Sequence, residues 1–187
     1  MNATHDIPKT TTSVVWMTGL PGAGKTTLAN AMAARLHDAH RHAIVLDGDT
    51  LRKGLCSDLG FSEADRTENV RRLAHVARLF QREGHTVVVA TISPLVQQRQ
   101  LARSIIGSDF LEVFVATPLA TCRQRDPKGM YAQAQLGQLP GFTGVSADYE
   151  PPAGADVTID TSNQGIDECV NTLIDALTPS RRQPVAQ

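Results

Sequence analysis

Several features that define other protein classes are missing or scarce in this chain of 187 residues. No stretch approaches the ~18 consecutive apolar residues of a membrane-spanning helix, and the first residues carry no signal-peptide pattern. Charge is nearly balanced, with 18 Lys and Arg against 19 Asp and Glu, which excludes a global attraction to nucleic acid or an anionic membrane. We therefore expect a cytoplasmic protein in which any anion site is a local cluster.

Cysteines are equally sparse. Cys56, Cys122 and Cys169 are odd in number, far apart and without a Cys-x-x-Cys pair, which argues against a disulfide framework and against a zinc site. No internal repeat or low-complexity tract is visible, and the length predicts a single domain. We expect the domain to span residues 13–177, between flexible arms at 1–12 and 178–187.

One motif is complete. Residues 19–26 match the phosphate-binding pattern G-x-x-x-x-G-K-[ST], between an apolar run and a good helix-forming segment. In such a loop the backbone N–H groups face an anion, the lysine reaches the β- and γ-phosphates, and the Thr26 hydroxyl ligates Mg²⁺. The pattern predicts ATP as co-substrate, held by Gly19, Leu20, Pro21, Gly22, Ala23, Gly24, Lys25, Thr26 and Thr27.

The rest of the chain alternates between strand and helix patterns. Continuously apolar runs, typical of strands buried on both faces, occupy 14–17, 43–46, 86–90, 110–115 and 157–159. Helical patterns occupy 25–37, 50–56, 62–83, 95–106, 118–124 and 165–177. This order predicts an α/β fold with a five-stranded parallel sheet covered by helices on both faces. Residues 126–155, rich in Gly, Pro and Gln, are expected to be an irregular lid over the nucleotide.

Acidic residues follow the second predicted strand. Asp47 and Asp49 should face the phosphate loop, because ligands of open α/β sheets bind beyond the carboxyl ends of the strands. A carboxylate there can accept a proton from an acceptor hydroxyl or help hold Mg²⁺. Asp49 is the better base candidate, since it stands further from the strand end. Asp and Gly also favour plain turns, which is the alternative.

A basic cluster follows. Arg66 and Asn69 are three residues apart on a predicted helix and share one face, with Arg52 shortly before them. Guanidinium groups pair bidentately with phosphate or sulfate, so such a cluster can clamp a doubly charged ligand. Scattered arginines on a helix are as readily a solvated face, and this pattern alone leaves both interpretations open.

Longer motifs resemble the adenylylsulfate kinase family over residues ~13–177. They are Asp47-Gly48-Asp49-x-x-Arg52, Leu59-Gly60-Phe61-Ser62-x-x-Asp65-Arg66-x-Glu68-Asn69-x-Arg71-Arg72, Ile92-Ser93-Pro94, Arg125-Asp126-x-Lys128-Gly129-Met130-Tyr131, Phe142-Thr143-Gly144 and Tyr149-Glu150-x-Pro152. The resemblance implies a P-loop kinase that transfers the γ-phosphoryl group of ATP to the 3′-hydroxyl of adenosine 5′-phosphosulfate (APS). The product, 3′-phosphoadenylyl sulfate (PAPS), is the activated sulfate donor of sulfate assimilation. It also implies a Mg²⁺-dependent enzyme, and we expect a homodimer without nucleic-acid or membrane partners.

The resemblance also implies roles for single residues. Asp47, Arg52, Phe61, Arg66, Asn69, Ile92, Ser93, Lys128 and Phe142 match positions that hold APS. Lys25, Asp49, Ser93 and Lys128 are the implied catalytic residues, Thr26 and Asp47 the metal site, and Arg125 a cofactor contact that packs on the ATP adenine. Ser93 matches a serine described in the family as a phosphoserine intermediate, but we expect direct transfer, with Ser93 positioning the substrate. Where the family commonly has an aromatic and a basic residue after Pro94, this chain has Leu95 and Val96.

Two other functions compete. A small P-loop kinase of the gluconate or shikimate type would need neither the Phe61 and Phe142 pair nor the Arg66–Asn69 motif. A non-catalytic nucleotide-binding module would not need intact Lys25 and Lys128. Release of ADP with APS, gluconate, shikimate or adenosine as acceptor distinguishes these functions.

Overall fold

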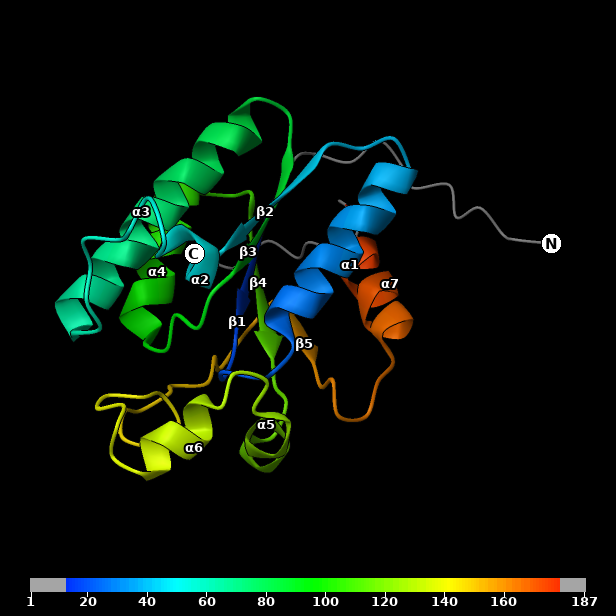
Figure 1. Ribbon diagram of the computed structural model, residues 1–187. Coiled ribbons are helices and arrows are strands. Elements are labelled where there is room, and N and C mark those ends of the chain that lie inside the picture. The colour runs from blue at the N-terminus through cyan, green and yellow to red at the C-terminus, as the bar shows by residue number, and fades with distance from the viewer. Residues whose placement is uncertain (1–12, 179–187) are drawn as a thin grey trace.

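The structure, a computed structural model, describes residues 13–178, so the arms expected at 1–12 and 178–187 lie outside the described residues except for Thr178. Five parallel strands form one sheet in the order β2-β3-β1-β4-β5 (Figure 1). They are β1 (Val14–Thr18), β2 (Ala43–Asp47), β3 (Thr86–Ala90), β4 (Phe110–Val115) and β5 (Val157–Ile159). The predicted α/β class and all five predicted strands are confirmed, each within one residue at either end.

Alternation along β1 explains how the two faces of the sheet are covered. Val15 and Met17 belong to one apolar cluster, while Val14 and Trp16 belong to another, because successive side chains of a strand point to opposite faces. The first cluster includes residues of α1 (Lys25–Asp38) and α7 (Ile166–Ala176), and the second includes residues of α3 (Glu63–Arg82) and α4 (Val96–Ile106). Figure 1 shows these two helix pairs on opposite sides of the strands. Burial on both faces accounts for the continuously apolar strand sequences.

The helix boundaries follow local capping chemistry. The Ser62 hydroxyl accepts a hydrogen bond from the backbone N–H of Asp65 and so begins α3, which matches the helix predicted over 62–83. The helix expected over 50–56 is shorter: α2 spans Gly48–Leu51 and is followed by turns. It ends early because the chain bends back, with the Cys56 N–H donating to the Leu51 carbonyl.

The segment 126–155 is less irregular than predicted. After α5 (Leu119–Arg125), a short helix α6 (Met130–Gln135) forms within it. The Asp126 carboxylate accepts hydrogen bonds from the N–H groups of Tyr131 (3.0 Å) and Ala132 (3.1 Å), which satisfies the first turn of α6. The surrounding glycines and prolines hid this helix in the sequence.

Because all strands are parallel, their carboxyl ends lie along one edge of the sheet. Figure 1 shows α5 and α6 beyond that edge, below the head of β4. None of the helices within residues 13–178 is both long and apolar enough to cross a membrane.

Candidate active site

A cavity of about 650 Å³ opens at the carboxyl edge of the sheet. Its walls come from the phosphate loop, the ends of β2 and β3, the N-terminal half of α3, the segment 125–143 and the segment 161–169. Almost every predicted site residue lines it. Gly19, Leu20 and Ala23 do not, because they turn into the body of the protein.

The phosphate loop needs glycine at two positions for different reasons. A Cβ on Gly19 would lie 2.5 Å from the carbonyl oxygen of Val115, so any side chain would displace the backbone of β4. Gly24 precedes α1 with φ of 102°, a left-handed conformation that L side chains rarely adopt. The loop therefore turns tightly between β1 and α1, and the free N–H groups at the start of α1 form an anion site.

Lys25 sits inside this loop. Its side chain is only 8% exposed, and the ammonium nitrogen donates to the carbonyl oxygens of Gly19 and Leu20, both at 2.8 Å. Burial disfavours the charged form and lowers the pKa of Lys25 to about 8, against the weaker opposing effect of nearby negative groups. A negatively charged ligand beside the buried ammonium would therefore stabilise the charged form of Lys25.

Thr26 and Asp47 bring together two side-chain oxygens of the kind that bind a metal ion. The Thr26 hydroxyl donates to one Asp47 carboxylate oxygen (2.7 Å), and the Thr50 N–H donates to the other (3.0 Å). Burial alone would raise the pKa of Asp47, but these hydrogen bonds outweigh it and hold the pKa below its usual value. A hydroxyl beside an ionised carboxylate fits Mg²⁺, which prefers few protein oxygens and completes its shell with phosphates and water. No larger His, Cys, Asp or Glu cluster with metal-ligand geometry occurs within residues 13–178.

Asp49 and Lys128 meet across the cavity. Lys128, from the segment between α5 and α6, donates from its ammonium nitrogen to an Asp49 carboxylate oxygen. More than half of each side chain is exposed. The contact joins the two predicted catalytic residues although they are 79 positions apart in the sequence.

The basic cluster surrounds an exposed ring. Phe61 is 62% exposed, and the guanidinium carbons of Arg52 and Arg66 lie 4.5 and 5.7 Å from its ring centroid. Arg66 also donates to the Phe61 carbonyl (2.9 Å) and to the Gly141 carbonyl (2.7 Å). Burial, and then the charge of Arg52, lower the pKa of Arg66. Both guanidinium groups lie at the Phe61 ring, and neither forms an ion pair with a carboxylate among the described residues, an arrangement that suits an anionic ligand.

Asn69 offers a second sign of a ligand. It is 4% exposed, yet its amide oxygen has no hydrogen-bond partner among the described residues. A buried polar atom without a partner is costly, and Asn69 lines the cavity one helical turn from Arg66. Its oxygen therefore marks a position where a ligand donor is expected.

Phe142 differs from Phe61 in its surroundings. It is 7% exposed and packs edge-to-face against Tyr131, with ring centroids 5.1 Å apart. The Tyr131 hydroxyl in turn donates to the Pro21 carbonyl of the phosphate loop (3.0 Å). Phe142 thus has a packing role besides lining the cavity, whereas Phe61 has little structural reason to be apolar.

The loop after β3 carries Ile92 and Ser93, and both line the cavity. Ser93 is buried, and its hydroxyl oxygen accepts a hydrogen bond from the Trp16 indole N–H at 3.1 Å. Its φ of 37° is unusual for a residue other than glycine.

At the opposite end of the cavity, Arg125 donates to the hydroxyl (2.7 Å) and carbonyl (2.8 Å) oxygens of Thr161. Thr161 follows β5 and lines the cavity with Gln164, Ile166 and Cys169, which the sequence analysis missed. The sequence indicated these residues only by their position after the last strand, because the carboxyl ends of all parallel strands lie along the edge of the sheet where ligands bind.

The chain resembles proteins of known function. Residues 11–160 match the model of the family described as adenylylsulphate kinase. An adenylyl-sulfate kinase of Paraburkholderia xenovorans is 53% identical over 162 residues, which cover 87% of this chain and 90% of the relative.

Two solved structures extend the comparison. The Mycobacterium tuberculosis APS kinase CysC, in complex with AMPPNP and APS, superimposes with a TM-score of 0.87 at 47% identity, over 90% of this chain and 98% of that one. A hexameric APS kinase from Thiobacillus denitrificans has a TM-score of 0.68 at 34% identity, over 90% of this chain and 29% of that longer one.

Proposed function

The chain belongs to the adenylylsulphate kinase family, and from this premise we propose that it transfers the γ-phosphoryl group of ATP to the 3′-hydroxyl of APS. The products are ADP and PAPS. One observation carries the proposal beyond family membership: a single cavity is lined by the phosphate loop, by the cluster around Phe61, Arg66 and Asn69, and by the contacting pair Asp49 and Lys128. A donor and an acceptor nucleotide can therefore meet end to end.

At the ATP end, the phosphate loop and the Lys25 ammonium hold the β- and γ-phosphates. Arg125 packs on the adenine, with Thr161 fixing its guanidinium. Thr26 and Asp47 hold Mg²⁺, which supplies positive charge to the phosphate oxygens when it is bound.

At the APS end, Phe61 and Phe142 stack on the adenine, with Ile92 beside it, because a ring face accepts any base without hydrogen bonding. Arg66, with Arg52 behind it, holds the phosphosulfate, and Asn69 receives a hydrogen bond from the ligand.

Phosphoryl transfer follows from this arrangement. The 3′-hydroxyl oxygen bonds to the γ-phosphorus as the bond from that phosphorus to the β-phosphate bridging oxygen breaks, and the Asp49 carboxylate takes the hydroxyl proton. Lys128 leaves Asp49 and neutralises the transferred group, which frees the carboxylate at the moment it is needed. Ser93, whose hydroxyl is oriented by the hydrogen bond from Trp16, positions the acceptor, and direct in-line transfer requires no covalent intermediate on it.

We further propose a cytoplasmic homodimer. Leu79 and Phe80, at the end of α3 remote from the cavity, are exposed apolar side chains of the kind that a second subunit covers. Sedimentation of the purified protein tests the homodimer, and a monomer at micromolar concentration contradicts it.

Enzymatic assay tests the reaction itself. ADP release in the presence of MgATP should depend on APS and should be absent with gluconate, shikimate or adenosine. Lys25→Ala, which should stay folded by circular dichroism, is the inactive control. Equal ADP release with gluconate or shikimate would favour another small-molecule kinase, and nucleotide binding without ADP release would favour a non-catalytic module.

A further inference from the structure

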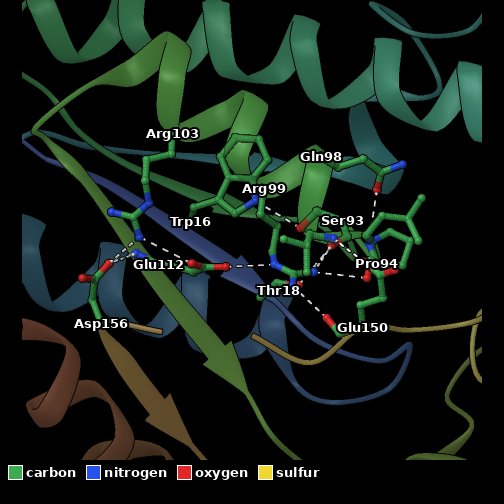
Figure 2. A network of polar contacts seen from close by, with 12 residues as sticks. Trp16, Thr18, Ser93, Pro94, Gln98, Arg99, Arg103, Glu112, Glu150 and Asp156 are labelled. Atoms are coloured by element: carbon green, nitrogen blue, oxygen red, sulfur yellow. Dashed lines mark hydrogen bonds and ion pairs between the residues drawn. The ribbon is translucent and has the colours of Figure 1, made fainter. Parts of the chain in front are cut away.

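A buried arginine lies outside the catalytic groups but contacts the loop that carries two predicted site residues, Ile92 and Ser93. Arg99, in the first half of α4, is 3% exposed. Figure 2 shows its guanidinium directed toward the loop after β3 and toward Glu150, while Glu112 approaches from β4. We define residues 92–94 as the acceptor loop and residues 149–150 as the lid stem, where the segment 126–155 returns toward the sheet.

The donors of Arg99 are divided between these elements. One terminal nitrogen donates to the carbonyl oxygens of Ser93 (3.0 Å) and Pro94 (3.1 Å), and the other donates to the carbonyl oxygen of Glu150 (2.7 Å). The Nε atom forms an ion pair with Glu112 at 2.9 Å, which compensates the buried charge. A planar guanidinium can bind several acceptors at fixed angles at once, and a lysine ammonium cannot reproduce this arrangement.

The lid stem and the acceptor loop also bind each other directly. The Glu150 N–H donates to the Pro94 carbonyl (2.9 Å), and the Glu150 carboxylate accepts from the Val96 N–H (2.6 Å). The Tyr149 hydroxyl lies 2.9 Å from that of Thr18, which donates to the Ile92 carbonyl (2.7 Å). Arg99 is the buried centre of this network, because its one guanidinium binds three backbone carbonyls of the lid stem and the acceptor loop together with Glu112 of β4.

The acceptor loop needs such support. Ser93 has a φ of 37°, a conformation that costs free energy and persists only when its surroundings over-determine it. Trp16 binds its hydroxyl and Arg99 binds its carbonyl, so the strained residue is held from both ends. The conformation of Ser93 in turn sets where Ile92 lies in the cavity.

We propose that Arg99 is a positioning residue that fastens the lid stem to the acceptor loop and thereby sets the affinity for the acceptor nucleotide. The inference rests on the proposed function, because the ligand concerned is APS. Among the described residues, Arg99 forms no hydrogen bond or ion pair with the phosphate loop or with the segment 161–169, so its effect should fall on APS and leave ATP binding unaffected.

Three variants test the proposal. Arg99→Lys keeps a cation beside Glu112 but loses the two terminal guanidinium nitrogens that bind the acceptor loop and the lid stem separately. In Arg99→Met with Glu112→Leu, two apolar residues replace the buried pair, a change that is often neutral for stability. Arg103→Met is the matched control: Arg103 lies one turn further along α4 and contacts Glu112 (3.4 Å) and Asp156 (3.1 Å), but not the acceptor loop.

Steady-state kinetics with each substrate varied separately is the first measurement. Arg99→Lys and the double variant should raise KM for APS about tenfold, the effect of losing about 1.4 kcal/mol of positioning. KM for ATP should change less than about twofold, and Arg103→Met should match the unsubstituted protein in both. An unchanged KM for APS in the folded double variant, or equal increases for both substrates, would show that Arg99 serves stability alone and would overturn the proposal.

Hydrogen exchange gives a second measurement that needs no substrate. The Glu150 amide should exchange faster in Arg99→Lys and in the double variant than in Arg103→Met, because the lid stem loses the hydrogen bond from Arg99 to the Glu150 carbonyl. If the Glu150 amide exchanges at the same rate in the Arg99 variants and in Arg103→Met, Arg99 does not fasten the lid stem, whatever the kinetics show. If the unsubstituted protein releases no ADP with APS, the proposed function fails, while the exchange comparison still decides whether Arg99 fastens the stem.

Discussion

Burial of Lys25 makes ATP binding depend on pH. Its pKa of about 8 belongs to a lysine enclosed by the phosphate loop, and a bound triphosphate places negative charge beside the ammonium and raises that pKa again. A group whose pKa is higher in the complex takes up a proton on binding once the pH exceeds its pKa in the free protein. Affinity should therefore be constant below about pH 8 and should weaken as the pH rises above it.

The magnitude follows from the fraction of free protein that carries the ammonium. With a pKa of about 8, roughly one molecule in ten is protonated at pH 9, so the apparent Kd for ATP should be about tenfold higher at pH 9 than at pH 7. At pH 8, binding should take up about half a proton per site.

Titration calorimetry with a non-hydrolysable ATP analogue measures both quantities, since proton uptake appears as a dependence of the heat on the ionisation enthalpy of the buffer. Lys25→Arg is the control, because its guanidinium stays protonated over this range and should abolish the pH dependence whatever its absolute affinity. A constant Kd between pH 7 and 9 in the unsubstituted protein, or the same increase in Lys25→Arg, would refute the reasoning.

Other expectations concern the acceptor and the base. Asp49→Asn should lower kcat by about 100-fold or more, because an amide accepts no proton, while APS affinity in calorimetry stays unchanged; near-normal turnover would remove Asp49 as the base. Phe61→Ala should weaken APS binding by about 1–3 kcal/mol without changing the melting temperature, since the ring is mostly exposed. Phe142→Ala should weaken APS binding and also lower unfolding stability by about 3–5 kcal/mol in denaturant titration, because that ring is packed against Tyr131. Equal weakening of ATP and APS binding would mean that Phe142 supports the lid generally. Arg66→Ala should weaken APS binding in a salt-dependent way, and a loss independent of ionic strength would contradict a charge contact.

The sheet was predictable because its signals are local. Buried parallel strands are continuously apolar, so each strand was identified within one residue. The phosphate loop was equally accessible, because its glycines meet demands of the backbone within a few residues. The short helix α6 was missed because the carboxylate that binds its first-turn N–H groups, Asp126, lies four residues before it, across a Pro-Lys-Gly turn.

The site was only partly predictable for a different reason. Residue types predict which side chains meet phosphate, but the pairing of Asp49 with Lys128 depends on how the segment after α5 folds back toward α2. Arg99 gave no signal at all. It stands in the mostly polar stretch 96–100, which resembles a solvated helix face, and its contacts with Glu112 and Glu150 come from segments distant in the sequence.

Trp16 is the only tryptophan of the chain, which gives its contact with Ser93 a practical consequence. The indole is fully buried in β1, and its N–H is bonded to the loop on which the acceptor nucleotide is expected to rest. Indole emission responds to the strength of that hydrogen bond and to the polarity around the ring. The protein therefore carries an intrinsic optical reporter beneath its acceptor site, and a fluorescence titration of the unlabelled protein can follow that loop as each nucleotide binds.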